Sequence, residues 1–189
     1  MTKIEKLTAI DKLFTENKNN IQQPANLIPI LKDFIFSMDE LKGDLLYPED
    51  LPYGRNVIFR SENFEAILMN WKPKQSSYIH DHGNSFGVVY VLTDGGNNVA
   101  YDADYCHIAT IPLSKGDFLE VSKGIYHRIE NPTDIHSVTL HFYAPPLNGM
   151  KVIDTKDVKR QFIVSNETGA WEPKNNEIVK SLVENIIEN

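Results

Sequence analysis

The chain is poor in cysteine, in basic charge and in long hydrophobic runs, and each shortage excludes a class of protein. Its single cysteine, Cys106, can form no internal disulfide and cannot build a zinc site that needs two or more cysteine ligands. Acidic residues outnumber basic ones by 26 to 19, giving a formal net charge of −7, so nucleic acid and anionic membrane are poor partners. No apolar run reaches the length of a membrane span, and the charges spread over residues 1–14 argue against a secretory signal. We therefore expect a cytoplasmic protein in a reducing setting.

The length allows one domain with a sizeable core. The 189 residues are 41% hydrophobic and 24% charged, which is typical of globular proteins. Residues 1–48 carry helical patterns, because apolar side chains recur at helical spacing between Ile4 and Phe14. Ser37 and Glu40 have the spacing of a capping box at the start of a further short helix. These helices are expected to pack on the segment that follows.

Short β-rich runs separated by turn residues dominate residues 50–155. The run 64–71 has apolar side chains on both faces, which is typical of a strand buried on both sides. Gly95–Asn98 is interpreted as a turn between two strands. Eight strands are predicted, near residues 56–60, 64–71, 76–82, 87–93, 106–112, 117–121, 125–130 and 136–143.

The C-terminal extension, residues 156–189, is more polar. It is predicted to hold a strand over Phe162–Val164 and a short helix ending in SLVENII. Many short, evenly spaced strands favour a sandwich or a small barrel. We expect one mainly β domain of all 189 residues, with helices before the β core and a short C-terminal helix after it.

Two histidine-containing motifs suggest a metal site. His80 and His82 lie two residues apart in a predicted strand, so their imidazoles point to one face, where neutral imidazoles can hold a metal ion. Alone, such a pair is more often found on a solvated face. The second motif has the spacing G-x7-G-x2-H-x3-N and consists of Gly116, Gly124, His127 and Asn131. Gly124 permits a tight turn that would aim His127 inward, which favours the metal site.

The two motifs resemble those of the cupin superfamily. Ser122 stands where the second motif usually has proline, and Lys74 replaces the opening glycine of the first. The glutamate that many cupins place shortly after His-x-His is absent. A three-histidine site without this carboxylate is the pattern of the cysteine dioxygenase family. Further segments resemble that family in order and spacing: YGRN at 53–56, SSYIHDHGNS at 76–85 and SVTLHFYAPP at 137–146.

The resemblance covers about residues 50–155 and implies an activity as well as a cupin-type jelly-roll barrel. It implies Fe(II) bound by His80, His82 and His127, with L-cysteine and O2 as substrates and cysteine sulfinic acid as product. We expect a monomer, with weak self-association as the alternative.

The resemblance also implies roles for residues of the substrate cavity. Thr139, His141 and Tyr143 alternate on one face of a predicted strand, and by themselves fit a solvated face as well as a cavity. In the family, His141 would orient the hydroxyl of Tyr143. Arg55, in the YGRN segment, would bind the substrate carboxylate through its planar fork of donors, and Tyr53 would line the pocket.

Some positions depart from the family or carry no motif. Animal members link a cysteine to the active-site tyrosine, but Gly87 stands at the matching position, so Tyr143 is expected to be free of a crosslink, as in many bacterial members. A cis peptide is expected at Ala144–Pro145. Trp71 is expected in the core, and Cys106 as a small buried hydrophobe.

Three other functions remain open at the level of sequence. The nearest alternative is a thiol dioxygenase for 3-mercaptopropionate or another small thiol, although related enzymes that act on mercaptopropionate carry glutamine at the position of Arg55. A cupin isomerase or hydrolase using zinc or manganese is the second. A cupin without catalytic activity, binding a small molecule, is the third.

Overall fold

Helices form the N-terminal segment of the computed structural model, which describes residues 1–183. They are α1 (Lys3–Asn17), α2 (Pro24–Lys32), α3 (Met38–Leu41) and a 3-10 turn (Lys42–Asp44). The predicted capping box at Ser37 and Glu40 is confirmed at the start of α3. Across residues 1–183, every helix is too short or too polar to span a lipid bilayer.

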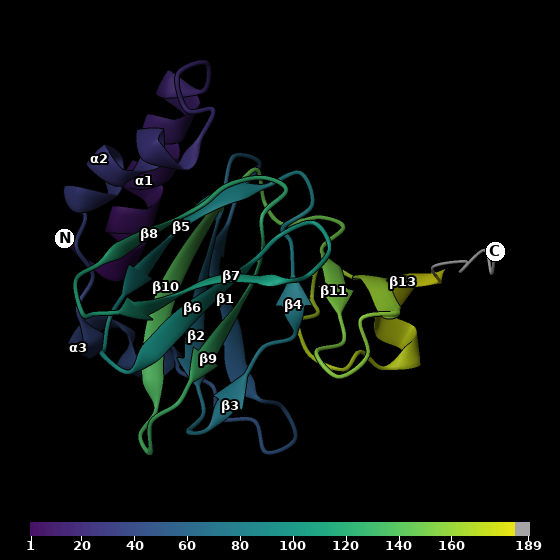
Figure 1. The fold of residues 1–189 in the computed structure, drawn as a ribbon. Coiled ribbons are helices and arrows are strands. Elements are labelled where there is room, and N and C mark those ends of the chain that lie inside the picture. The colour runs from purple at the N-terminus through teal and green to yellow at the C-terminus, as the bar shows by residue number, and fades with distance from the viewer. Residues whose placement is uncertain (184–189) are drawn as a thin grey trace.

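Two antiparallel sheets face each other (Figure 1). The first contains, in spatial order, β1 (Tyr53–Arg60), β2 (Glu65–Trp71), β10 (Ser137–Ala144), β5 (Phe86–Val91) and β8 (Phe118–Val121). The second contains β13 (Ile178–Val183), β12 (Arg160–Val164), β11 (Lys151–Ile153), β4 (Ile79–His80), β9 (Tyr126–Asn131), β6 (Gly96–Tyr101) and β7 (His107–Leu113), with β3 (Gln75–Ser76) paired to β9. The predicted mainly β fold with N-terminal helices is confirmed.

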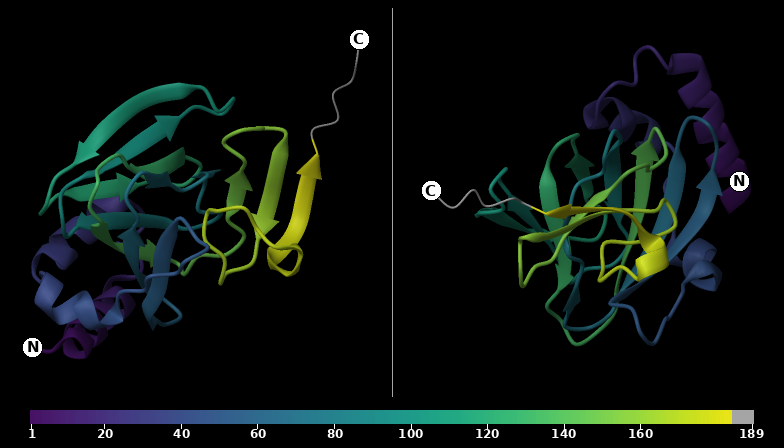
Figure 2. Two further views of the ribbon diagram at one scale, coloured as in Figure 1. Left: turned by 90° about the horizontal axis from the view of Figure 1, so that it is seen from below. Right: turned by 90° about the vertical axis from the view of Figure 1, so that its right-hand side faces the viewer.

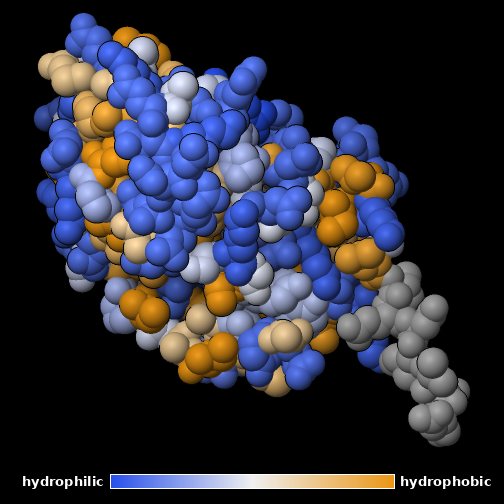
Figure 3. Space-filling view, turned by 90° about the horizontal axis from the view of Figure 1, so that it is seen from above, coloured by the Kyte–Doolittle hydropathy of each residue, from blue (hydrophilic) through white to orange (hydrophobic). Residues whose placement is uncertain are grey.

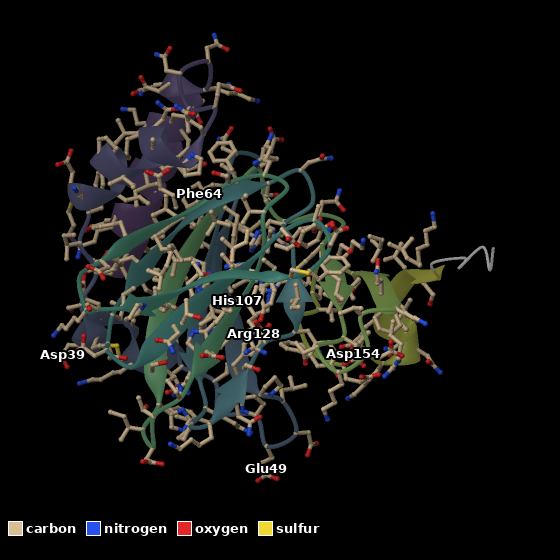
Figure 4. All side chains as sticks on the ribbon, viewed as in Figure 1. Asp39, Glu49, Phe64, His107, Arg128 and Asp154 are labelled. Carbon is tan, nitrogen blue, oxygen red and sulfur yellow. The ribbon has the colours of Figure 1, made fainter. Side chains whose placement is uncertain are left out.

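The first sheet separates two hydrophobic cores. Ala66 and Leu68 of β2 face the helices, whereas Ile67 and Met69 face the space between the sheets. Every residue of β2 is buried, so the prediction of a strand covered on both sides is confirmed. Phe64, labelled in Figure 4, stacks on Phe14 of α1 at 5.0 Å between ring centroids.

The C-terminal strands β11, β12 and β13 lie on the side of the molecule opposite the helices, next to β4 (Figure 2). The sequence predicted a short helix ending in SLVENII, and this prediction is wrong for the part that the structure describes. Residues 178–183 form β13, paired with β12, and the remainder of that segment lies outside the described residues. The β-branched pair Ile178–Val179 favours a strand, and β12 offers an edge with which to pair.

Two further predictions about strands need correction. Gly96–Asn98, interpreted as part of a turn, begins β6, because the turn lies just before it and the backbone of Asn97 and Asn98 pairs with both β7 and β9. The run predicted as one strand over 76–82 is interrupted, so that β4 ends at His80. The cis peptide at Ala144–Pro145 is present as predicted.

Candidate metal centre

Three buried histidines meet between the two sheets. His80 at the end of β4 pairs directly with His127 of β9, and their ring centroids are 4.6 Å apart. His82 lies beyond the strand end, with its ring centroid 5.0 Å from that of His80 and 4.9 Å from that of His127. One ring nitrogen from each residue lies within 4.8 Å of the others. The group contains no carboxylate.

Local turns bring His82 to the group although it is not in the strand. Gly83 adopts a φ of +56°, a left-handed conformation that glycine takes without strain. The Asp81 carboxylate accepts hydrogen bonds from the backbone N–H of Gly83 at 3.0 Å and of Lys151 at 2.8 Å. Asp81 is therefore used by the turn, and it is not a member of the histidine group.

Hydrogen bonds define which ring nitrogens face the centre. Nδ1 of His80 lies 3.0 Å from the carbonyl oxygen of Tyr78, and Nδ1 of His127 lies 2.6 Å from Oδ1 of Asn98. Both acceptors require a proton on Nδ1, which leaves the lone pair on Nε2. Nε2 of His127 lies 3.3 Å from Nε2 of His82, whose own Nδ1 is buried without a hydrogen-bond partner.

Asn98 was not identified from the sequence. It stands in the segment interpreted as a turn, and no motif marks it. Its position becomes apparent only through the pairing of β6 with β9, which sets Asn98 opposite Ile129 and near His127.

Burial keeps the three imidazoles neutral. Loss of solvation lowers the pKa of His80, and it lowers the pKa of His82 and His127 well below the usual range, with the neighbouring histidines as a further cause. Neutral imidazole is the form that binds a metal. Two nitrogen ligands about 2.1 Å from one ion and at right angles to each other are separated by about 3 Å, close to the observed Nε2 distance. The residues present therefore fit a metal ion bound by three imidazoles.

A chain of hydrogen bonds runs along β10 beside the histidines. The indole Nε1–H of Trp71 donates to Oγ1 of Thr139, which lies 2.8 Å from Nε2 of His141. Nδ1 of His141 is in turn 2.8 Å from the hydroxyl of Tyr143. Burial lowers the pKa of His141 to about 3, so its imidazole is neutral at physiological pH and carries a single N–H.

The hydroxyl of Thr139 accepts the proton of Trp71 and donates its own to Nε2 of His141, so the hydrogen bonds all run from Trp71 toward Tyr143. His141 then carries its proton on Nδ1 and donates it to the oxygen of Tyr143, whose own O–H is free to donate elsewhere. Burial raises the pKa of Tyr143, which keeps this hydroxyl protonated. The ring of Tyr143 stacks on that of His82 at 4.9 Å between centroids. Trp71, expected only as a core residue, is thus also the first donor in this series of hydrogen bonds.

A cavity connects the histidines to the remaining candidate residues. The cavity is narrow, with an internal volume of about 20 Å³, which is room for about one water molecule. The lining residues are Tyr53, Arg55, Met69, Trp71, His80, His82, Ile129, His141, Tyr143, Leu147, Met150, Gly169 and Ala170. The structure therefore gathers at one cavity the six candidate residues Tyr53, Arg55, His80, His82, His141 and Tyr143, with His127 next to them in the histidine group.

Gly87 lies against the ring of Tyr143. A Cβ atom at Gly87 would be 2.6 Å from Cδ1 and 3.0 Å from Cε1 of that ring, and 2.5 Å from the carbonyl oxygen of Phe142. The glycine therefore lets β5 and β10 approach closely at this point, and it offers no side chain for a crosslink to Tyr143.

His107, His136 and the cysteine belong neither to the histidine group nor to the cavity lining. His107 lies on β7 (Figure 4) and His136 precedes β10, and both are exposed. Cys106 is exposed too, so the expectation that it is a buried hydrophobe is wrong. It immediately precedes β7, an edge strand with most of its side chains in solvent.

The sequence matches the cysteine dioxygenase type I family over residues 49–156, more than half of the chain. All seven candidate site residues lie within the matched range.

Solved structures with a similar fold include a protein from Thermus thermophilus, which is 21% identical with a TM-score of 0.49, covering 58% of this chain and 98% of that chain. A double-stranded β-helix protein from Klebsiella pneumoniae is 20% identical with a TM-score of 0.49, covering 62% and 94% of the two chains. Oxalate decarboxylase from Lactobacillus farciminis, as a formate complex, is 17% identical with a TM-score of 0.50, covering 60% of this chain and 34% of that chain. At this identity the last similarity concerns the fold alone.

Proposed function

The chain belongs to the cysteine dioxygenase type I family, and on this premise we propose that it is an Fe(II)-dependent dioxygenase that oxidises L-cysteine to cysteine sulfinic acid. The family and the three-histidine group support a cupin-type, metal-dependent thiol dioxygenase. The observation that carries the proposal is the shared cavity, in which a metal-binding group without carboxylates faces an arginine and a tyrosine hydroxyl.

His80, His82 and His127 would hold the iron through ring nitrogens that face one another. Their partners at Nδ1, the carbonyl of Tyr78 and the side chain of Asn98, fix two of the three rings. When bound, the iron supplies the redox chemistry by which dioxygen reacts with a thiol. The neutral imidazoles add no negative charge to the site, and a positive site favours the thiolate form of the substrate.

Arg55 would bind the carboxylate of the substrate. Its Nη2 donates one hydrogen bond to a backbone carbonyl at 3.3 Å, which leaves other guanidinium donors for a carboxylate in the cavity. The hydroxyl of Tyr53 accepts a backbone N–H at 2.6 Å, so Tyr53 contributes mainly a fixed aromatic wall. A thiol that carries a carboxylate is thereby held at both ends, between Arg55 and the histidine group.

Tyr143 would direct a proton toward the reacting groups. The imidazole of His141 supplies a hydrogen bond to the tyrosine oxygen and so aims the tyrosine O–H into the cavity. Because burial raises the pKa of Tyr143, the hydroxyl acts as a hydrogen-bond donor at neutral pH and is not itself charged. Its role is to orient substrate and dioxygen, an electrostatic contribution made by a fixed donor.

The overall reaction balances without a further reductant, since one cysteine thiol and one O2 give one sulfinic acid. The test is oxygen uptake by protein loaded anaerobically with Fe(II), comparing L-cysteine with 3-mercaptopropionate and identifying products by mass. We expect cysteine sulfinate in amounts that match the oxygen consumed and little turnover of the other thiol. Preference for 3-mercaptopropionate would reject the substrate assignment, and no uptake with either thiol would reject the dioxygenase.

We further propose the setting in which the protein acts. The exposed Cys106, with no cysteine to pair with, supports the reducing cytoplasm, and the net charge of −7 supports a protein that acts on small molecules and binds neither nucleic acid nor membrane. The chain would act as a monomer and as one domain. Sedimentation at several concentrations tests the monomer.

A further inference from the structure

One wall of the cavity comes from a segment outside the range that matches the family. Residues 165–170, here called the strap, connect β12 to the C-terminal segment, whereas the family match ends at residue 156. Gly169 and Ala170 of the strap nevertheless line the cavity together with the candidate site residues. Ser165 and Asn166 begin the strap near the surface, and Thr168, Gly169 and Ala170 are buried.

The strap is attached to the substrate side of the cavity. Nη2 of Arg55 donates to the backbone carbonyl of Asn166 at 3.3 Å, and the backbone N–H of Ala170 donates to the hydroxyl of Tyr53 at 2.6 Å. The strap thus contacts both residues assigned to substrate binding. A shift of the strap would change the position of the guanidinium.

The strap is also attached to the metal side. The carbonyl of Ala170 accepts the backbone N–H of Tyr78 at 2.7 Å, and the carbonyl of Tyr78 is the partner of Nδ1 of His80. The same residue of the strap therefore connects to Tyr53 on one side and, through Tyr78, to His80 on the other. These bonds fix the separation between the end of the cavity at Arg55 and Tyr53 and the end of the cavity at the histidines.

The strap packs at a position where a side chain has no room. A Cβ atom at Gly169 would lie 2.1 Å from Cζ3 of Trp171 and 2.6 Å from the hydroxyl of Tyr53. Both neighbours belong to a buried aromatic group, in which the rings of Tyr53 and Trp171 are 5.1 Å apart. Any larger residue at Gly169 must therefore displace the strap relative to the rings of Tyr53 and Trp171.

We propose that the strap is a specificity element, which positions Arg55 through the carbonyl of Asn166 and closes the cavity at Gly169 against thiols longer than cysteine. This inference rests on the proposed function. A substrate held at its carboxylate by Arg55 and at its sulfur near the histidines must match the fixed distance between them. The cavity of about 20 Å³, bounded by Gly169 and Ala170, leaves no spare room for an added methylene while the strap is in place. Pockets discriminate about 10-fold to 200-fold between substrates that differ by one methylene.

The experiment compares kcat/KM for L-cysteine and for L-homocysteine, which is one methylene longer, in wild type, Gly169→Ala and the control Gly43→Ala. A Cβ atom at Gly43 would meet nothing within 4 Å, so the control tests the substitution without displacing the strap. We expect the preference for cysteine to fall about tenfold in Gly169→Ala, through a higher KM for cysteine, and to stay at the wild-type value in Gly43→Ala.

Hydrogen exchange distinguishes a displaced strap from an unfolded protein. In Gly169→Ala the amides of residues 168–170 should exchange at least tenfold faster, and those of β9 should be unchanged. Thr168→Val serves as a second, milder variant, because it removes the 2.8 Å bond between the Ser165 and Thr168 hydroxyls without altering volume greatly. It should shift the preference in the same direction.

A preference for cysteine within twofold of wild type, in a Gly169→Ala protein whose strap amides exchange faster, would overturn the specificity role. The same holds if Thr168→Val loosens the strap and leaves the preference unchanged. Failure of wild-type protein to oxidise either thiol would instead reject the proposed function, and this inference with it.

Discussion

The three clustered histidines differ in what holds their rings. His80 and His127 each have a hydrogen-bond acceptor at Nδ1, whereas Nδ1 of His82 has none and its ring is held by stacking on Tyr143. Acceptors at the outer nitrogen raise the basicity of the ligand and fix its orientation. Among the three proposed ligands, His82 therefore has the least support from hydrogen bonds, and its position depends on the aromatic ring beside it.

Replacing His82 by alanine should abolish stoichiometric iron binding, because the two remaining imidazoles cannot cap one side of the ion. Metal content after anaerobic loading and desalting is the measurement, with circular dichroism to verify the fold. His107→Ala is the matched control, since His107 is an exposed histidine on β7 and should leave the metal content at the wild-type value. Full iron occupancy in His82→Ala would contradict the assignment.

Arg55→Ala should raise KM for L-cysteine far more than it lowers kcat. The lost charge-assisted hydrogen bonds contribute about 1.5–3 kcal/mol, which corresponds to roughly 10-fold to 150-fold in KM. Steady-state oxygen uptake over a range of cysteine concentrations measures both constants. Arg55→Lys keeps the charge without the planar fork, so its KM for L-cysteine should lie between those of wild type and Arg55→Ala. Unchanged cysteine kinetics in Arg55→Ala would exclude this residue as the anchor.

Among the elements, the turn before β3 contains a residue in an unfavourable conformation. Lys74 has a φ of +58°, in the left-handed region where a side chain is strained. This is the position at which the first cupin motif usually begins with glycine. The lysine amine donates to the carbonyl of Pro132 at 2.8 Å and pairs with the exposed Asp134 at 3.2 Å, contacts that contribute little in solvent.

Lys74→Gly should therefore stabilise the protein by up to about 1 kcal/mol, since relief of the left-handed strain slightly exceeds the entropy cost of glycine in the unfolded chain. Denaturant unfolding measures the difference. Lys74→Ala removes the amine but keeps the Cβ atom, so it should give no gain. Equal effects of the two substitutions would show that the backbone conformation of this turn does not matter.

The helices α1 and α3 are linked by an ion pair that depends on pH. Nζ of Lys6 lies 2.6 Å from Oε1 of Glu40, and the backbone N–H of Ser37 donates to the other carboxylate oxygen at 2.8 Å. These contacts lower the pKa of Glu40 from 4.5 to about 2 in the folded state. Because the folded pKa is the lower one, the contribution to stability is complete above pH 4.5 and is lost as the pH falls toward 2.

Glu40→Gln should lower the free energy of unfolding by about 1 kcal/mol at pH 6, a typical value for a pair near the surface. The difference between wild type and variant should shrink at pH 3, where the carboxylate of the unfolded protein is protonated. Denaturant titrations at the two pH values measure it. A difference that grows as the pH falls would show that the pKa of Glu40 is not lowered by folding.

At the scale of the whole molecule, the two faces of the first sheet have different roles, one structural and one at the candidate site. The face toward the helices carries a hydrophobic core, and the face toward the second sheet carries the histidines, the hydrogen bonds along β10 and the cavity. Seen from above, hydrophilic residues cover much of the surface, and hydrophobic ones lie between them in smaller patches (Figure 3). Because the helices pack on the face of the first sheet that points away from the cavity, they contribute stability without contacting the candidate centre.

Ile10→Ala should lower the free energy of unfolding by about 2–4 kcal/mol while the iron affinity of the folded protein stays unchanged. Ile10 is fully buried in the core between helices and sheet. Ile4→Ala, on the same helix but 55% exposed, should change stability by less than about 0.5 kcal/mol. Loss of iron affinity in folded Ile10→Ala would mean that the two faces of the sheet are coupled.

The sequence by itself determined the features that depend on local pattern. Periodic apolar residues identified the N-terminal helices and the doubly buried β2, and the two motifs identified the histidine group, with Arg55, His141 and Tyr143 added by resemblance. Both turn glycines of these motifs, Gly116 and Gly124, have positive φ values. Such signals lie within a few residues of one another, so they are visible without a fold.

Only the tertiary structure decided the rest. Asn98 meets His127 across 29 positions in the chain, and Asn166 meets Arg55 across 111. Contacts of this kind depend on strand register and on where a C-terminal segment crosses the cavity, which no local pattern encodes. The same reason explains β13, because its conformation depends on the free edge of β12 that it joins.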